Sequence, residues 1–145
     1  MYHKILVALD TTASDQALLV HIVQLAQLAK SELLLAHVAD GWVARNFDQL
    51  NLVESEEMKE DWGYLESTAA RLREETGLTV HTRLALGSPP AQIVKVAEAE
   101  ACDLIALASH GHRLVGDIIH GSTIDAVRHN TRVPIIVVPP LRSAR

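Results

Sequence analysis

The sequence has little of what builds disulfide frameworks or nucleic-acid surfaces. Its one cysteine, Cys102, excludes an internal disulfide framework and favours a reducing compartment. Thirteen Lys and Arg residues stand against 18 Asp and Glu residues, which gives a formal charge of −5, and no basic run is dense enough to follow a phosphate backbone. We therefore expect no nucleic-acid partner.

Long hydrophobic runs are missing as well. The opening MYHKILVALD contains too short an apolar run for a signal peptide, and no uninterrupted stretch approaches the roughly 18 residues that a membrane span needs. Internal repeats and low-complexity tracts are also absent from the sequence. We expect a cytoplasmic protein without a membrane partner.

Short apolar runs, in contrast, are plentiful. A chain of 145 residues with 48% hydrophobic residues is long enough for one good core and short for two, which predicts a single domain over residues 1–145. Four runs rich in Val, Ile and Leu predict strands covered on both faces, at residues 3–9, 32–38, 103–108 and 133–138. Residues 79–86 alternate between apolar and polar side chains, which predicts a half-exposed edge strand.

Helical periodicity fills the segments between these runs. Two stripes with apolar residues three or four apart each predict a helix that lies against a sheet. The first is Leu18, Ile22, Leu25 and Ala29, and the second is Met58, Trp62, Leu65, Ala69 and Leu72. A hydroxyl followed by a proline, Ser88 and Pro89, predicts a third helix start, and Gly121 or Ser122 predicts a fourth.

Strands that alternate with helices predict a doubly wound α/β sandwich. If the alternating third strand lies at one edge, the order of the five parallel strands is 3-2-1-4-5, with four helices in the outer layers. One long irregular segment, residues 39–52, carries Trp42 and Phe47 and is either a lid or an ordered flap over the core.

Open parallel sheets bind ligands beyond the carboxyl ends of their strands, where the strand order reverses. In the predicted order this point lies between the first and fourth strands. The first strand ends at Asp10, before TTAS, and the fourth ends at Ala108, before SHGHRLVGDIIHGSTID. Both loops would border one crevice.

The second of these loops has features of an anion site. Gly111 and Gly116 let the backbone approach a ligand, and Gly121, Ser122 and Thr123 lead into a helix whose first amide groups lack partners. Such a helix start attracts phosphate. Glycine before a helix is common, however, and Ser122 as an ordinary cap explains the same residues.

The stretch DLIALASHG, nine further residues, GS and then VPIIVV together resemble the carboxyl-terminal signature of the universal stress protein family (UspA-like). Its nucleotide-binding members carry G-2x-G-9x-G-S/T. The opening HKILVALD, the AHV that ends at Val38, and the stretch GSPPAQIVKVAEAEACDLIALAS match as well, so that the resemblance covers nearly the whole chain. It implies a Rossmann-like, adenine nucleotide alpha hydrolase-like fold, a homodimer and an ATP site.

The resemblance also implies which residues bind the nucleotide. Asp10, with Thr11 beside it, and the backbone around Val38 would contact adenine and ribose, and Leu107 and Ser109 would supply a wall and a hydroxyl. The residues lining the phosphates would be Ala108, Gly111, Gly121, Ser122 and Thr123. Ala108 stands where the family motif has its first glycine, and its added methyl group bears directly on ATP affinity.

Each of these residues also has a simpler interpretation. Asp10 could be a turn or cap residue, or Ser14 could cap the first helix instead. Cys102 is expected to pack beside the fourth strand. His21 and His129 are expected to be ordinary, partly exposed helix residues.

The histidines of the long loop have spacings that match no structural zinc pattern. His110, His112 and His120 lie near Asp117 in the sequence, and we predict no metal site there. HGH at 110–112 echoes a motif of nucleotidyltransferases, but there it follows the first strand and here it follows the fourth. We assign no catalytic residue, because no nucleophile has an identifiable base.

The sequence thus favours a stress-response regulatory module that binds ATP, or ADP or AMP, with or without Mg²⁺, and that acts on an unknown signalling partner. One alternative is a slow ATPase or nucleotidyl transferase in which His110 or His112 assists phosphate chemistry. Another is a dimeric adaptor with an empty pocket. A homodimer through Ile135 to Val138 would cover the apolar free edge of the sheet.

Overall fold

Five parallel strands form one sheet in the computed structural model, which describes residues 1–39, 51–109 and 117–141. The strands are β1 (Lys4–Ala8), β2 (Glu32–Ala39), β3 (Val80–Leu86), β4 (Leu104–Ala108) and β5 (Ile135–Val138). They lie in the order β3-β2-β1-β4-β5, as predicted. The five predicted strand positions are confirmed, with ends that differ by no more than two residues.

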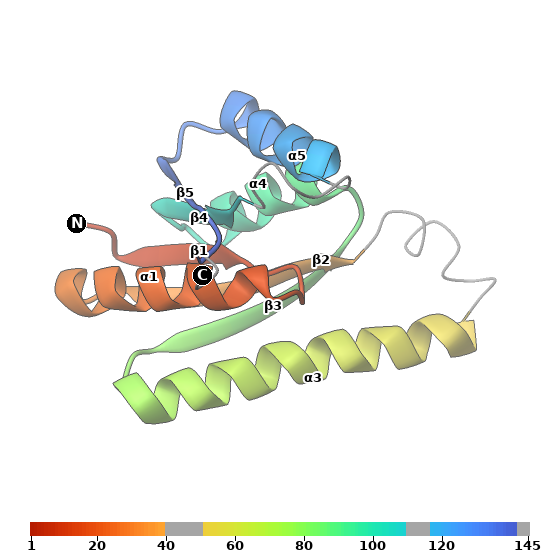
Figure 1. Cartoon of the computed structure of the whole chain (residues 1–145), viewed down its shortest axis with the longest axis horizontal. Coiled ribbons are helices and arrows are strands. Elements are labelled where there is room, and N and C mark those ends of the chain that lie inside the picture. Colours follow the sequence, from red (N-terminus) through yellow and green to blue (C-terminus); the bar gives the residue numbers. More distant parts are fainter. Residues whose placement is uncertain (40–50, 110–116, 142–145) are drawn as a thin grey trace.

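Four helices cover the two faces of the sheet (Figure 1). They are α1 (Ser14–Ala29), α3 (Asn51–Thr76), α4 (Pro89–Ala99) and α5 (Asp117–Asn130). Neighbouring side chains of a strand point to opposite faces, so that Leu33 and Leu35 pack toward α1 and α3 while Leu34 packs toward α4 and α5. The inner strands β1, β2 and β4 are therefore buried on both faces, which explains their almost continuous apolar sequence.

The helix starts agree with the sequence at α4 and disagree at α5. Helix α4 begins at Pro89 as predicted, although the Ser88 hydroxyl makes no capping hydrogen bond. Helix α5 begins at Asp117, so the prediction of a start at Gly121 or Ser122 is wrong. The glycine and the hydroxyl suggested a helix boundary, but both lie within the helix.

The predicted apolar stripe of α3 needs one correction. Leu65, Ala69 and Leu72 are buried against the sheet, but Trp62 is 46% exposed. The position that faces inward one turn before Leu65 is occupied by Asp61, which pairs with a histidine of β2. A polar contact thus replaces the expected aromatic one at the end of the helix stripe.

Both edges of the sheet carry the expected kind of strand. The alternating strand β3 pairs with β2 alone, and β5 pairs with β4 alone. Val137 of β5 is 41% exposed, while Val138 is buried. Cys102 is buried beside β4 as predicted, and burial raises the pKa of its thiol to about 11.

Two further expectations concern other parts of the chain. The lid or flap with Trp42 and Phe47 falls within residues 40–50 and lies outside the described residues. His21 and His129 are exposed residues of α1 and α5, as expected. No helix among the described residues is both long and apolar enough to cross a membrane.

Candidate functional site

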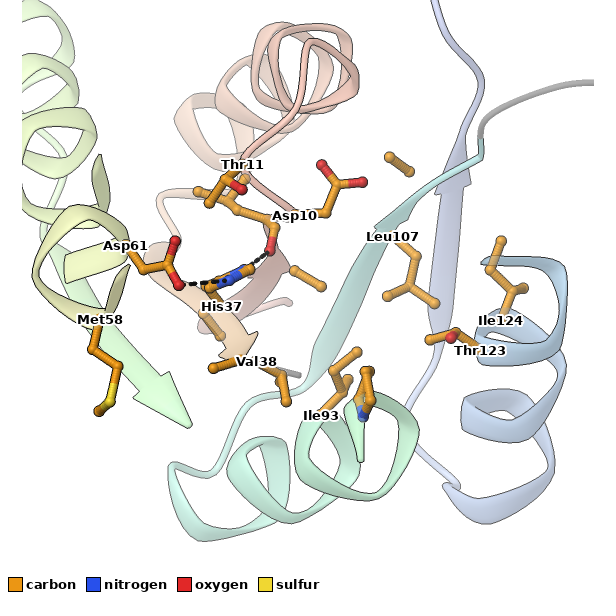
Figure 2. A pocket seen from close by; sticks show the side chains of 16 residues that line it. Asp10, Thr11, His37, Val38, Met58, Asp61, Ile93, Leu107, Thr123 and Ile124 are labelled. Atoms are coloured by element: carbon orange, nitrogen blue, oxygen red, sulfur yellow. Dashed lines mark hydrogen bonds and ion pairs between the residues drawn. The ribbon is translucent and has the colours of Figure 1, made fainter. Parts of the chain in front are cut away.

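A cavity of about 490 Å³ lies at the carboxyl ends of β1, β2 and β4 (Figure 2). Strands β1 and β4 are hydrogen-bonded neighbours, so the cavity occupies the point where the strand order reverses. Helices α3, α4 and α5 complete its walls. Its described lining is Ala8, Leu9, Asp10, Thr11, Ala36, His37, Val38, Ala39, Met58, Asp61, Pro89, Ile93, Leu107, Ala108, Thr123 and Ile124.

Most of the predicted binding residues meet at this cavity. Those that line it are Asp10, Thr11, Val38, Leu107, Ala108 and Thr123. Ser109 follows Ala108 but is not part of the lining. Gly111 lies outside the described residues, and Gly121 and Ser122 belong to α5 at positions whose surroundings are not described. The carboxyl ends of β1 and β4, about 100 residues apart in sequence, therefore border one space, as the strand order requires.

The loop after β1 turns sharply around Asp10. The carboxylate oxygen Oδ1 of Asp10 accepts hydrogen bonds from the backbone N–H of Thr12, at 3.0 Å, and from the Thr12 hydroxyl. The simple interpretation of Asp10 as a turn residue is thus correct, and the same residue lines the cavity. Thr11 has φ 63°, a left-handed conformation that is uncommon for a β-branched residue.

A second, buried carboxylate stabilises this turn by hydrogen bonds to its backbone. Asp15, in the first turn of α1, is only 1% exposed, and its two oxygens accept hydrogen bonds from the N–H groups of Asp10 and Thr11, each at 2.9 Å. The Tyr64 hydroxyl of α3 donates a third, at 2.7 Å. Burial raises the pKa of Asp15 to about 6, although these hydrogen bonds lower it. Ser14, the expected cap, is the first residue of the helix, and Asp15 satisfies the amides before it.

Asp15 is not among the binding residues that the sequence predicts. A carboxylate in the first turn of a helix is usual, because it interacts favourably with the helix dipole. Nothing in the sequence separates a buried residue of this kind from an exposed one. The signal that was available is its position five residues after Asp10, within reach of the same turn.

The rim of the cavity toward α3 is polar. The residues that form this rim, His37 and Asp61, are also not predicted from the sequence. His37 of β2 donates from Nδ1 to the carbonyl oxygen of Leu9 at 2.8 Å, and its Nε2 lies 3.4 Å from Oδ2 of Asp61. Their side chains are only 13% and 18% exposed. Figure 2 shows the two side chains pointing toward each other, with Met58 about one turn before Asp61 in α3. This contact joins α3 to the ends of β1 and β2.

The opposite side of the cavity is an apolar slot. Val38, Ile93, Leu107 and Ile124 line it from β2, α4, β4 and α5, and all four belong to or pack against the core on the α4 and α5 side. Ala108 packs instead against the core on the α1 side. The methyl group that departs from the family motif therefore lies on the other face of β4 from the Leu107 side chain.

The helix start at Asp117 changes the argument for phosphate binding. The first four N–H groups of an α-helix have no partner within the helix. These belong to residues 117–120, whereas Gly121 is the fifth residue of α5. Thr123 and Ile124 still line the cavity, so the second turn of α5 borders it. The helix can contribute its dipole there, but Gly121 and Ser122 are not its first residues.

The expectations about the histidine loop lie mostly outside the described part of the chain. His110 and His112 fall in residues 110–116, and nothing is described of the side chains of His120 and Asp117. Within residues 1–39, 51–109 and 117–141, no three His, Cys, Asp or Glu side chains are grouped to hold a metal ion, and residues 110–116 lie outside these ranges. The metal prediction for the loop stays a prediction.

Comparison with known proteins identifies the class to which this fold and crevice belong. The sequence pattern of the universal stress protein family matches residues 1–139. The chain belongs to the universal stress protein family.

Relatives in sequence and structure agree with this. Universal stress protein MJ0577 of Methanocaldococcus jannaschii is 27% identical over an alignment of 155 positions, which covers 95% of each chain. The solved structure of MJ0577 aligns with 99% of each chain at a TM-score of 0.75 and 28% identity.

Two more distant structures share the fold. A universal stress protein in complex with cAMP has a TM-score of 0.70 at 17% identity, over 95% of this chain and 97% of its own. The universal stress protein from Archaeoglobus fulgidus in complex with dAMP has a TM-score of 0.64 at 21% identity, over 94% and 98%.

Proposed function

We propose that this chain is a regulatory module of the stress response that binds an adenine nucleotide, ATP, ADP or AMP, in the cavity between β1 and β4. The observation that carries the proposal is the cavity itself: one end is an apolar slot and the other holds the Asp10 carboxylate. Its volume of about 490 Å³ suits a small organic ligand. A planar base and a hydroxylated sugar need these two environments side by side.

The lining supports one orientation of the nucleotide. The base lies in the slot formed by Val38, Ile93 and Leu107, and the ribose hydroxyls donate to the Asp10 carboxylate, which is acceptor-only when it is ionised. The phosphates then extend toward Thr123 and the start of α5, where the helix dipole favours negative charge. Gly111, Gly121, Ser122 and Ser109 complete the phosphate end in this proposal, and Mg²⁺ accompanies the phosphates of ATP.

The two solved universal stress proteins in complex with cAMP and dAMP support the choice of an adenine nucleotide. They share the fold with this chain at 17% and 21% identity, so they speak for what the fold can hold. The preference among ATP, ADP and AMP is decided by the phosphate end.

His37 favours binding over catalysis. A general base needs a ring nitrogen that can take a proton from a nucleophile. Both nitrogens of His37 are already engaged, Nδ1 by the Leu9 carbonyl oxygen and Nε2 by the Asp61 carboxylate. The described lining thus holds this histidine in a structural contact, and the proposed module releases its nucleotide unchanged or hydrolyses it slowly.

The protein is proposed to be one domain that forms a cytoplasmic homodimer through Ile135 to Val138. A strand at the edge of a sheet has unpaired backbone groups, and β5 adds the exposed side chain of Val137 to them. Pairing with a second copy covers both. The buried, lone Cys102 fits a reducing compartment.

Calorimetry tests the binding site directly. We expect the purified protein to bind one ATP, ADP or AMP per chain, and Val38→Trp to abolish binding, because the larger ring fills the slot. Val20→Trp is the matched control: the same substitution at an exposed position of α1 leaves binding unchanged. Equal affinity in both variants, or no heat in the wild-type protein at millimolar nucleotide, contradicts the proposed site, and the second result favours an adaptor with an empty pocket.

Turnover separates the module from the enzyme of the same fold. We expect stoichiometric binding of ATP with little steady release of phosphate or pyrophosphate. Multiple turnovers that disappear in His110→Ala or His112→Ala would instead establish a slow ATPase or nucleotidyl transferase.

A further inference from the structure

The turn that brings Asp10 and Thr11 to the cavity does not hold its shape by backbone hydrogen bonds alone. Thr11 adopts a left-handed conformation, which a threonine rarely occupies unless neighbouring contacts impose it. The N–H groups of Asp10 and Thr11 both donate to one buried carboxylate, that of Asp15, which does not line the cavity. Each bond is 2.9 Å long.

Asp15 is connected to the long helix α3 as well as to the turn. The hydroxyl of Tyr64 donates to its Oδ2 at 2.7 Å, so one carboxylate accepts three hydrogen bonds, two from the turn and one from α3. An ionised carboxylate has acceptor sites for all three donors. A protonated carboxyl group has a donor on one oxygen and cannot accept all three in the same way.

We propose that Asp15 is the positioning residue of the nucleotide site: its buried carboxylate holds the Asp10–Thr11 turn in the shape that lines the cavity, and Tyr64 couples that shape to α3. The inference rests on the proposed nucleotide binding and adds a residue that does not line the cavity. It also predicts that binding releases a proton, because the shape that binds is the one in which Asp15 is ionised.

The surroundings of Asp15 set the pH at which this coupling operates. Burial raises the pKa of Asp15 to about 6, the hydrogen bonds from the Asp10 backbone N–H and the Tyr64 hydroxyl lower it, and the charge and side-chain hydrogen bond of Asp10 raise it further. Asp10 from the turn and Tyr64 from α3 are the titratable groups that face it, and Arg71 of α3 acts on Tyr64. One pH unit below this pKa, about a tenth of Asp15 remains ionised.

The decisive experiment compares ATP affinity between pH 7.5 and 5.0 in the wild-type protein and Asp15→Asn. Asparagine keeps the shape of the side chain but, like the protonated acid, offers one full acceptor. We expect Asp15→Asn to bind about tenfold or more weakly at pH 7.5 and about equally at pH 5.0, because the wild-type protein is then largely protonated. Titration of the ATP phosphates is common to both proteins and cancels in the ratio. A ratio that stays constant with pH overturns the proposal.

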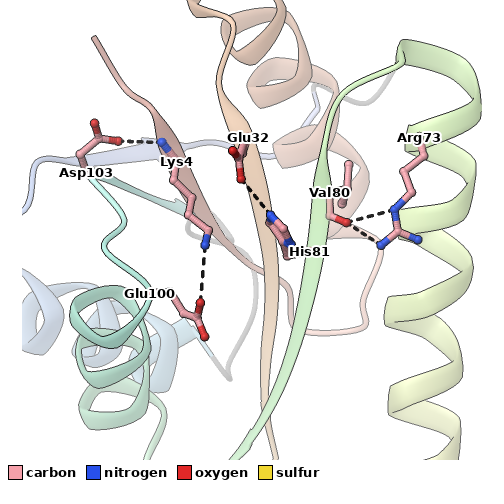
Figure 3. A network of polar contacts seen from close by, with 7 residues as sticks. All are labelled: Lys4, Glu32, Arg73, Val80, His81, Glu100 and Asp103. Carbon is pink, nitrogen blue, oxygen red and sulfur yellow. Dashed lines mark hydrogen bonds and ion pairs between the residues drawn. The ribbon is translucent and has the colours of Figure 1, made fainter.

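The matched control is Asp103→Asn at the opposite, amino-terminal end of the sheet (Figure 3). Asp103 also uses both carboxylate oxygens to accept two successive backbone N–H groups, those of His3 and Lys4, at 2.8 and 3.0 Å. Its loss therefore costs the same kind of hydrogen bonds far from the cavity. We expect the ATP affinity of Asp103→Asn to equal that of the wild-type protein at both pH values, and an equal loss in both variants contradicts a positioning role of Asp15.

Tyr64→Phe gives a second readout that a merely structural role does not predict. Removal of the hydroxyl takes away a hydrogen bond that lowers the pKa of Asp15. The pH at which affinity falls should then move upward from about 6, with affinity at pH 8 retained. An unchanged midpoint overturns the coupling through Tyr64, and this variant decides the question if circular dichroism shows that Asp15→Asn does not fold.

A measurement without nucleotide separates the two proposals. In nuclear magnetic resonance spectra of the ligand-free protein, the amide signals of Asp10 and Thr11 should titrate with a midpoint near 6 and should not titrate in Asp15→Asn. If they titrate but ATP does not bind at pH 7.5, the nucleotide function is wrong while the control of the turn by Asp15 stands. If ATP binds and the signals do not titrate, the control by Asp15 is wrong and the nucleotide function stands.

Discussion

Asp61 of α3 and His37 of β2 form an ion pair at the rim of the cavity, with 3.4 Å between Oδ2 and Nε2. The other ring nitrogen, Nδ1, donates to the Leu9 carbonyl oxygen at 2.8 Å. One imidazole ring thereby ties the long helix to the ends of two strands. The wall formed by Met58 and Asp61 depends on this connection.

Asp61→Asn should weaken both the fold and the ligand site. The pair is mostly shielded from solvent, and its loss should lower the free energy of unfolding by about 1 kcal/mol and ATP affinity severalfold. Glu75→Gln is the matched control, because it removes the Arg71–Glu75 pair of the same helix, whose side chains are 55% and 57% exposed. Urea unfolding and calorimetry measure both quantities, and equal effects of the two substitutions would contradict a special role of the rim contact.

Ala108→Gly should alter affinity only moderately. The substitution restores the glycine of the family motif, but the Ala108 methyl group packs toward α1 and away from the Leu107 side of the strand. We expect ATP to bind more tightly by at most about tenfold, at a cost of about 0.5–1 kcal/mol in stability, because glycine weakens a strand. A gain of hundredfold or more would mean that the methyl group blocks the phosphate path directly.

The free energy of unfolding should depend on pH through the ionisation of Asp15. Its pKa is raised in the folded protein from 3.8 to about 6, so the folded state binds a proton that the unfolded state has already released in this range. The contribution of Asp15 to the free energy of unfolding therefore decreases as the pH rises from about 4 to about 6, by about 3 kcal/mol in total, and is constant above. Urea titrations of wild-type protein and Asp15→Asn at several pH values isolate this contribution as their difference. A difference independent of pH would show that Asp15 ionises as it does in the unfolded chain.

Val137→Lys should dissociate the proposed homodimer. Val137 is the exposed residue of the edge strand β5, and a lysine on a sheet edge opposes pairing with a second edge. His81→Lys is the control on the other edge strand, β3, where His81 is also exposed. Sedimentation velocity should give a dimer for the control and a monomer for Val137→Lys. A wild-type protein that is monomeric at micromolar concentration would reject the dimer itself.

The fold followed from the sequence because its determinants are local. Runs such as LLLAHV and LIALA can be satisfied only between two layers of helices, and the alternation at Val80, Thr82 and Leu84 places that strand at an edge. The edge position of this strand also predicts where the crevice lies and that Asp10 and Ala108 both border it. These inferences need only the period of the pattern.

The polar contacts beneath the site could not be predicted in this way. Asp61 and Trp62 are neighbours in a charged helix, and only the direction of His37 decides that the carboxylate faces inward and the ring outward. Asp15 resembles any acidic residue in a first helical turn until Tyr64, 49 residues later, is brought against it. Such partners depend on tertiary structure and have no period in the sequence.

The thiol of Cys102 lies in the core beside β4, and burial keeps its pKa near 11, far above the pH of a cell. Peroxides and disulfides react with the thiolate form, which is scarcely populated there. It is the only thiol of the chain, so we expect the folded protein to react slowly with thiol oxidants. If this protein takes part in a response to oxidative damage, the signal reaches it through a bound metabolite, a partner or another side chain rather than through this thiol.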